Sequence, residues 1–166
     1  GQNEIKTSLI KTVQEGRISH AQLFSGDEGS GGLPLALAYA RYISCENRNN
    51  EDSCGECSTC KKFDIFQFAD LHFSYPFFNR TTGGSNAEEF IAEWRKQLLK
   101  NPYFDLNTWR NSLDAENKQL TIGVKESSRL IEKLNLTSYE GGYKFVIIWM
   151  PENRKTLKPK TKIKLN

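Results

Sequence analysis

A cluster of glycines separates a short apolar run from an apolar helical pattern near the start of the chain. The run AQLF (Ala21–Phe24) is followed by SGDEGSGG and then by LPLALAYARYI. Pro34 falls near the beginning of this second segment, where a helix tolerates proline because its first N–H groups have no intrahelical partner. A strand, a glycine loop and a helix in this order open many nucleotide-binding α/β sheets. The order of the three segments therefore predicts an α/β fold.

Strand and helix patterns continue to alternate along the rest of the chain. DLHFSYP (Asp70–Pro76) is typical of a strand, and KFVIIWM (144–150) is typical of a central strand covered on both faces. Ser85 or Asn86 can cap a helix that Asn101-Pro102 ends. Further helices are expected where apolar residues recur at helical spacing, at Ile5, Leu9 and Val13, at Trp109 and Leu113, and at Val124, Ile131 and Leu134. We therefore expect a parallel sheet of at least three strands, flanked by helices.

Length and charge limit the class of protein. The chain has 166 residues, enough for one ordinary domain, and 37% hydrophobic residues supply its core. We find no apolar stretch of the roughly 20 residues that cross a bilayer and no secretory pattern at the start, so a reducing cytoplasm is expected. The net charge is +3, but residues 1–153 hold 17 basic against 20 acidic residues, a net charge of −3. A basic domain surface for nucleic acid is therefore not expected.

The glycine cluster keeps only part of a phosphate-binding loop. Gly26, Gly29 and Gly31 have the G-x-x-G-x-G spacing that lets successive backbone N–H groups face a phosphate. Gly32 stands where such a loop carries the lysine for the terminal phosphates, and Leu33 stands where it carries the hydroxyl for Mg²⁺. A glycine loop kept for its tight turn is therefore favoured over a working ATP site.

The end of the last apolar strand lacks the second half of that machinery. A nucleotide hydrolase positions a metal ion and an attacking water there with acidic residues. Trp149 and Met150 stand at those positions in KFVIIWMPE. A dinucleotide site is favoured even less, since Pro34 occupies the last glycine position of G-x-G-x-x-G. We therefore expect no ATPase activity and no bound ATP, and we assign no catalytic residue.

The four cysteines fall within sixteen residues, at Cys45, Cys54, Cys57 and Cys60. Four thiolates saturate a tetrahedral Zn²⁺ and leave no open position for water, which is typical of a structural site. An iron–sulfur run places its fourth cysteine downstream, before a proline, whereas here the fourth cysteine lies upstream. Unrelated thiols or disulfides are a third possibility, and a reducing compartment disfavours disulfides. The spacing therefore favours one structural zinc ion.

These features together resemble the AAA+ clamp-loader ATPase family, and within it the delta-prime type. The resemblance covers most of residues 1–150, and its most specific element is the cysteine module directly behind the loop helix. The other residues that carry it are Gly1-Gln2, RISHAQLFSGDEGSGG (Arg17–Gly32), ADLHF (Ala69–Phe73), IGVKESSRLIEKLN (Ile122–Asn135) and YEGGYKFVII (Tyr139–Ile148). A P-loop (AAA+) type fold with an embedded zinc module is what the resemblance implies.

The resemblance also implies a role in bacterial DNA replication by DNA polymerase III. The motor subunits of the family, gamma and tau, keep the lysine that Gly32 replaces, so its loss implies a delta-prime stator that does not turn over ATP. The implied partners are the gamma/tau and delta subunits, the sliding clamp, and primed DNA through the complex. Two other functions stay open: an ATP-hydrolysing motor subunit with an unusual loop, and a free zinc-dependent nucleic-acid-binding module.

Residues 77–120 look like a helical insertion relative to the family. Their aromatic side chains could pack against the domain or stack on single-stranded bases, and acidic neighbours favour packing. These side chains are Trp94, Tyr103, Phe104 and Trp109. His20 and His72 are isolated from any nucleophile in the sequence and are expected to be polar residues of the fold.

The match to the family weakens beyond Glu152. We therefore expect a domain at residues 1–152, with the zinc module at 45–60, and a basic, disordered tail at 153–166. The C-terminal part of the family fold is expected to be missing from this sequence, as in a fragment, a truncated product or a numbering closed over a gap.

Overall fold

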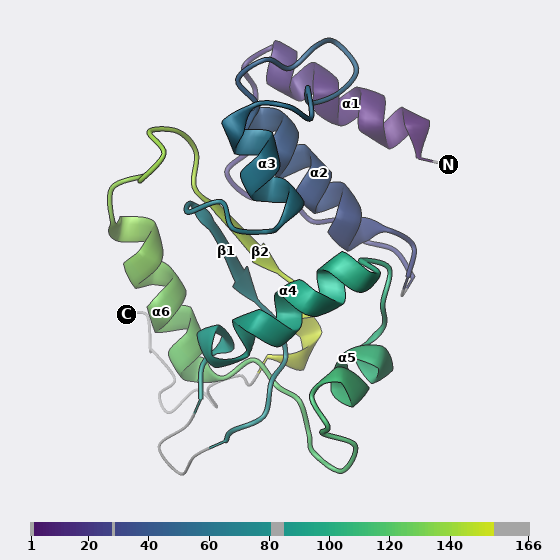
Figure 1. The fold of residues 1–166 in the computed structure, drawn as a ribbon, viewed down its shortest axis with the longest axis vertical. Coiled ribbons are helices and arrows are strands. Elements are labelled where there is room, and N and C mark those ends of the chain that lie inside the picture. The colour runs from purple at the N-terminus through teal and green to yellow at the C-terminus, as the bar shows by residue number, and fades with distance from the viewer. Residues whose placement is uncertain (1, 28, 81–84, 155–166) are drawn as a thin grey trace, which may run out of the picture.

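The structure, a computed structural model, describes residues 2–27, 29–80 and 85–154 (Figure 1). Six helices and two strands are assigned in these ranges, with two short 3₁₀ turns. In chain order they are α1 (Asn3–Gln14), α2 (Gly32–Ser44), α3 (Ser58–Asp64), β1 (Leu71–Ser74), η1 (Ala87–Phe90), α4 (Ile91–Lys100), α5 (Leu106–Ser112), α6 (Val124–Asn135), β2 (Phe145–Ile148) and η2 (Pro151–Asn153). The chain is thus an α/β protein in which helices surround a small sheet.

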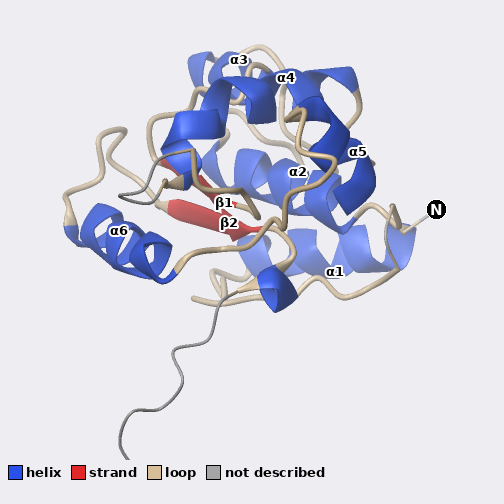
Figure 2. Cartoon of the chain, turned by 90° about the horizontal axis from the view of Figure 1, so that it is seen from below, coloured by secondary structure: helices blue, strands red, loops and turns tan. Residues whose placement is uncertain are grey.

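The sheet consists of β1 and β2, which run parallel. Their register pairs Leu71 with Phe145 and Ser74 with Ile148. Beyond the strands, the Phe145 N–H donates to the Asp70 carbonyl and the Trp149 N–H donates to the Ser74 carbonyl, each at 2.8 Å. The parallel arrangement of these two predicted strands is therefore observed. In the described ranges, α4 crosses one face of the pair (Figures 1 and 2).

The expected third strand, Ala21–Phe24, is not part of the sheet in the described ranges. Residues 22–24 and β2 line a common cleft of about 440 Å³ instead, so the backbone of Ala21–Phe24 has no strand beside it to pair with. β2 is consequently an edge strand, and Ile148 at its end is 49% exposed. The expectation that β2 is covered on both faces was therefore wrong.

Aromatic side chains fill most of the core. Tyr75, which directly follows β1, stacks on Trp94 of α4 at 4.1 Å between ring centroids, and Trp109 of α5 meets both rings edge-on. The three side chains are fully buried. Phe104 is buried against Trp94 as well, at 5.4 Å. Segment 77–120 therefore packs into the same core as the strands, as expected for three of its four aromatic residues; Tyr103 is 57% exposed.

The helix predicted after Ser85 or Asn86 begins with a capping box. The Asn86 side chain accepts the Glu88 N–H at 2.9 Å, and the Glu89 carboxylate accepts the Asn86 N–H at 3.1 Å. This reciprocal pair satisfies two N–H groups that a helix start leaves without partners. η1 then continues into α4, which ends at Lys100 as the Asn101-Pro102 pair predicts.

α6 forms where its apolar spacing predicts a helix, but it buries a different face. Val124, Ile131 and Leu134 are exposed, whereas Glu126 and Leu130 are buried. The Glu126 carboxylate accepts the Ala87 N–H at 3.2 Å, and Arg129 donates to the Phe73 carbonyl at 2.9 Å. A paired carboxylate and guanidinium therefore attach this helix to β1 and η1, in place of its apolar stripe.

The ends of the described chain lie in helical or bonded segments. In α1, only Val13 of the predicted apolar stripe is buried, and Gly16 follows the helix at φ +65°. Most of the expected tail at 153–166 lies outside the described residues; its Asn153 carbonyl accepts the Ile122 N–H at 3.0 Å. No helix among the described residues has the length and apolar character that crossing a membrane requires.

Candidate functional site

The four predicted cysteines come together at the end of α2. Their sulfur atoms all lie within 4.8 Å of one another, and the Cys45 and Cys54 sulfurs are 3.5 Å apart. The Cys45–Cys57 and Cys54–Cys60 sulfur pairs are each 4.0 Å apart. Four sulfurs bound to one Zn²⁺ at about 2.3 Å lie about 3.8 Å from each other in a tetrahedron. The spacing of the thiols therefore fits a tetrahedral four-sulfur metal site.

Backbone N–H groups are directed at these sulfurs. The Cys54 N–H donates to the Cys45 sulfur at 3.2 Å, and the Cys57 N–H donates to the Cys54 sulfur at 3.3 Å. Gly55 supports this turn with φ +78°, a conformation that favours glycine. Such donors stabilise thiolate, the form that binds metal. They lower the pKa of the Cys54 thiol to about 6, the Cys57 and Glu56 N–H groups being the main cause.

Two features of the cluster oppose each other electrostatically. Burial raises the pKa of the Cys45 thiol, because it penalises the charged form. Burial also opposes ionisation of Cys60, but a hydrogen bond from Arg41 and other donors outweigh it and lower the pKa of that thiol. Without a cation, four thiolates could not all ionise at such spacing. A bound divalent cation removes this conflict, which is a second indication that the cluster suits a metal.

Arg41 connects the cluster to the helix behind the glycine loop. Its guanidinium pairs with Asp64 of α3 at 2.8 Å and contacts Cys60. The Arg41 Nε atom is buried and has no hydrogen-bond partner. A positive group with an unused donor beside the sulfurs fits a centre of four thiolates and one divalent cation, which carries two negative charges.

The predicted glycine loop precedes α2 and makes a tight turn. Gly29 and Gly31 have φ of +77° and +97°, and Gly31 is the N-cap of α2. The Ser30 N–H donates to the Asp27 carbonyl at 3.0 Å, and the Gln2 amide donates to the Ser30 carbonyl. Gly26 and Gly32 do not have positive φ. Two of the four predicted glycines are therefore required by backbone conformation.

The two positions that would complete a phosphate loop do other things. Gly32 is the first residue of α2 and contributes no side chain. Leu33 is buried in the aromatic core, so its side chain is directed away from the loop's open side. At the end of β2, Trp149 packs on Phe104 and Trp94 with ring centroids 4.9 and 5.4 Å apart. Apolar packing thus takes the places where a hydroxyl and an acid would act.

Two carboxylates that the sequence analysis did not single out line the cleft between the loop and β2. Asp27 lies in the glycine loop and Glu152 follows β2, and both are exposed. In the part of the chain that the structure describes, the four cysteines are the only group of three or more potential metal ligands. Asp27 and Glu152 therefore do not form a second metal cluster there. Their places beside the loop and after the strand were the signal available in the sequence.

Asp70 fixes the turn that leads into β2. Its carboxylate accepts the Ser138 hydroxyl and the Glu140 N–H at 2.8 Å, and the Tyr139 N–H at 3.0 Å. Burial opposes ionisation, but these three donors outweigh it and hold the pKa of Asp70 below its ordinary value. Asp70 belongs to the ADLHF segment, so this segment has a positioning role.

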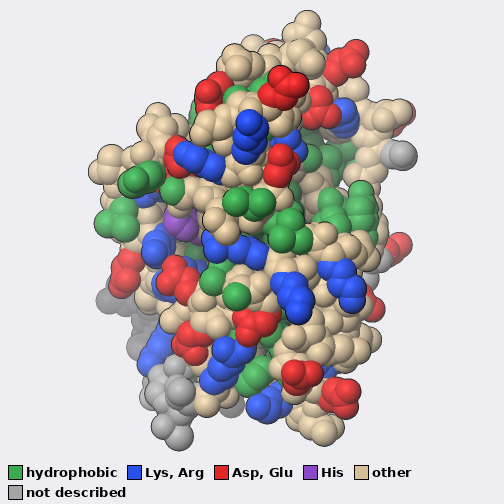
Figure 3. All heavy atoms as spheres, in the orientation of Figure 1, with side chains coloured by type: hydrophobic (Ala, Val, Ile, Leu, Met, Phe, Trp, Pro, Cys, Tyr) green, Lys and Arg blue, Asp and Glu red, His purple; other side chains and the backbone are tan. Residues whose placement is uncertain are grey.

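The remaining sequence candidates are dispersed. His20 is exposed in the segment before the glycine loop. His72 lies on β1, where burial, followed by the charge of Lys133, lowers its pKa. Acidic and basic side chains are interspersed over the face drawn in Figure 3. This mixture is consistent with the near-balanced charge of residues 1–153.

Comparison with known proteins gives a consistent result. Residues 1–157 match the protein family described as "DNA polymerase III, delta subunit". The chain is 37% identical over 71 residues to DNA polymerase III subunit tau/gamma of Haemophilus influenzae and to subunit tau of Escherichia coli, which covers 43% of this chain and 10% and 11% of those proteins. It is 33% identical over 78 residues to subunit delta' of Bacillus subtilis, covering 45% of this chain and 23% of that protein. The matched region therefore spans about a tenth to a quarter of these relatives.

Proposed function

The chain belongs to the family of DNA polymerase III delta subunits, and from this premise we propose that it is a non-catalytic stator of a bacterial sliding-clamp loader. The family match and the relatives named tau, gamma and delta' support a clamp-loader subunit of the AAA+ type, represented here by its N-terminal domain. The stator role is the finer part of the proposal. It rests on the chemistry that the glycine loop and the end of β2 can perform.

The observation that carries the stator role is the loss of both halves of an ATPase site. Phosphoryl transfer depends almost wholly on positioned charge: a lysine on the terminal phosphates, a metal ion, and acids around it. Gly32 supplies no lysine charge, Leu33 is buried in the core, and Trp149 is packed between aromatic rings. Asp27 and Glu152 line the cleft, but no hydroxyl at position 33 joins them to hold Mg²⁺. The site therefore has no set of groups that could activate a phosphate.

The proposal includes a structural zinc ion on Cys45, Cys54, Cys57 and Cys60. When bound, the ion would supply a permanent cross-link between the end of α2 and the start of α3. The residues of the chain prepare this cross-link: N–H groups stabilise the thiolates, and Arg41 contributes a positive charge beside them. Because four sulfurs saturate the ion, the proposed role is structural.

The proposed partners follow from the family. As a clamp-loader subunit, the chain would assemble with gamma or tau and delta subunits, and through them act on the sliding clamp and primed DNA in the cytoplasm. We further propose the domain limits expected from the sequence: a domain at residues 1–152, the zinc module at 45–60, the insertion at 77–120 and a basic tail at 153–166. The net charge of −3 over residues 1–153 favours protein partners over direct DNA contact.

An ATP-hydrolysing motor subunit is the second candidate. One observation favours it: the relatives named tau or gamma reach 37% identity, against 33% for the relative named delta'. Those matches cover less than half of the chain, and the loop chemistry argues the other way.

Calorimetry with Mg-ATP, together with a phosphate-release assay, tests the stator role. The measurements are made on this chain and on the product of the whole gene, with an ATP-hydrolysing tau subunit as the positive control. We expect neither turnover nor micromolar binding by either form of this protein. Micromolar binding with measurable turnover would favour the motor subunit instead.

A further inference from the structure

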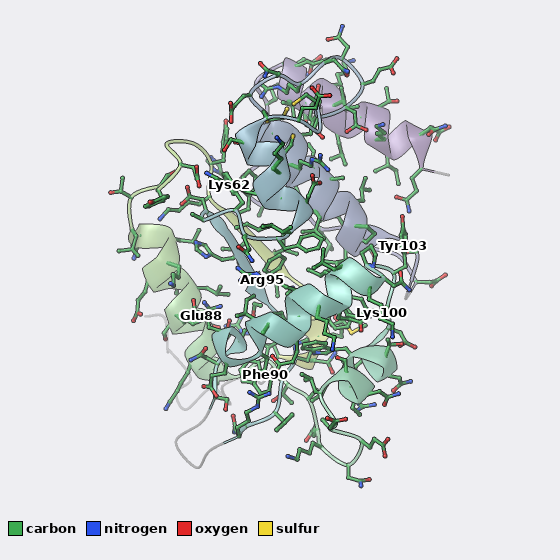
Figure 4. All side chains as sticks on the ribbon, in the orientation of Figure 1. Lys62, Glu88, Phe90, Arg95, Lys100 and Tyr103 are labelled. Atoms are coloured by element: carbon green, nitrogen blue, oxygen red, sulfur yellow. The ribbon has the colours of Figure 1, made fainter. Side chains whose placement is uncertain are left out.

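The connection between α4 and α5 lies against the glycine loop, although about 70 residues separate them in the sequence. A Cβ atom added to Gly31 would lie 3.1 Å from the Tyr103 ring, and one added to Gly29 would lie 3.8 Å from the Tyr103 carbonyl oxygen. In Figure 4, Tyr103 lies beside the end of α4, next to the segment that enters α2. The ring and the backbone of Tyr103 thus both lie at van der Waals distance from the loop.

The next residue, Phe104, contacts the other half of the degenerate site. Its ring is 4.9 Å from that of Trp149, which directly follows β2, and its side chain is 4% exposed. Pro102, Tyr103 and Phe104 line the same 440 Å³ cleft as the glycine loop and residues 143–152. One short connection therefore reaches both the loop that would hold a phosphate and the strand end that would hold its metal.

We propose that Pro102–Phe104 is a built-in substitute for a nucleotide, and that Tyr103 excludes nucleotide phosphates from the glycine loop. This inference rests on the proposed stator function and gives segment 77–120 a role in it. Phe104 is the buried anchor, since it joins the aromatic core. Tyr103 is the residue that determines specificity, since its ring covers Gly31.

Two features of Tyr103 suit this role. Its carbonyl oxygen lies near Gly29, and a carbonyl dipole directed at the loop repels an approaching phosphate. Its side chain is 57% exposed, so that truncating it leaves the aromatic core intact. Gly31 in turn must remain glycine for two reasons, its φ of +97° and the ring beside it.

The test separates the effect of Tyr103 from the effect of the missing lysine. Gly32 tolerates a side chain, because an added Cβ would meet its nearest neighbour at 3.6 Å and φ is not positive. ADP is titrated into four full-length variants while amide chemical shifts of residues 29–33 are followed by NMR. The variants are Gly32→Lys alone and Gly32→Lys combined with Tyr103→Ala, with Tyr103→Phe, or with Tyr139→Ala as a control for loss of an exposed tyrosine.

We expect the Gly32→Lys, Tyr103→Ala variant to bind ADP at least tenfold more tightly than the other three. Phenylalanine at position 103 should exclude ADP as tyrosine does, because the ring makes the contact. Equal affinity in all four variants would overturn the proposal, and so would the absence of a nuclear Overhauser effect between the Tyr103 ring and the Gly31 α protons in the unmodified chain. ADP binding by the unmodified chain, with that effect retained, would count against the stator function while leaving the contact in place.

Discussion

Replacing Asp70 should destabilise the protein and detach the turn that positions β2. The Asp70 carboxylate accepts three hydrogen bonds from residues 138–140, at 2.8 to 3.0 Å. A hydrogen bond to a charged group contributes about 1.5 to 3 kcal/mol to stability. Tyr139 is 85% exposed, so water can replace part of what the turn loses. We therefore expect Asp70→Asn to lower the free energy of unfolding by about 3 kcal/mol, less than the sum of three bonds.

The assay is urea unfolding at pH 7, followed by the same measurement at lower pH. The folded-state pKa of Asp70 lies below its ordinary value of 3.8, so its stabilisation is present above that pH and is lost as pH falls through the folded pKa. The difference between wild type and Asp70→Asn should therefore narrow in acid. Asp114→Asn is the control, because Asp114 is exposed and asparagine tolerates its φ of +50°. A loss below about 0.5 kcal/mol, or a difference that does not depend on pH, would refute the reasoning.

Three further outcomes are expected. Metal analysis of protein purified under reducing conditions should give close to one zinc per chain, and Cys57→Ser should lower the melting temperature by about 5 °C or more; iron, or no metal, would contradict the zinc assignment. Arg41→Met should weaken zinc affinity about tenfold or more in a chelator competition, with Arg41→Lys restoring part of it, since second-shell partners have effects of this size. A chain of residues 1–154, with 18 basic against 20 acidic residues, should show little salt-dependent DNA binding by fluorescence anisotropy, and a steep salt slope would argue for direct DNA contact.

The cysteine cluster could be predicted because its information is local. All four sulfurs belong to residues 45–60, so that spacing alone limits where they can lie. The cap at Asn86 was predictable for the same reason, since a capping box spans four residues. Zinc as the occupant of the cluster stays a prediction.

The wrong expectations concern contacts between distant segments. The apolar pattern of Ala21–Phe24 predicts a strand, but a strand also needs a partner backbone, and across the cleft it has none beside it. The apolar stripe of α6 predicts its buried face, but Glu126 has partners on η1 that periodicity cannot reveal. The contact of Tyr103 with the glycine loop likewise leaves no mark in either local sequence.

The register of the sheet sets an order for folding during synthesis. Leu71 pairs with Phe145, 74 residues later, whereas the cysteines close a span of 15 residues. Closing the longer loop costs about 1.4 kcal/mol more chain entropy, from the logarithmic dependence on length. At roughly 5 to 20 residues per second, several seconds of translation separate Cys60 from Ile148. The metal module can thus close on the ribosome while β1 still waits for its only strand partner in the described chain, so zinc supply would act on the nascent polypeptide well before the sheet exists.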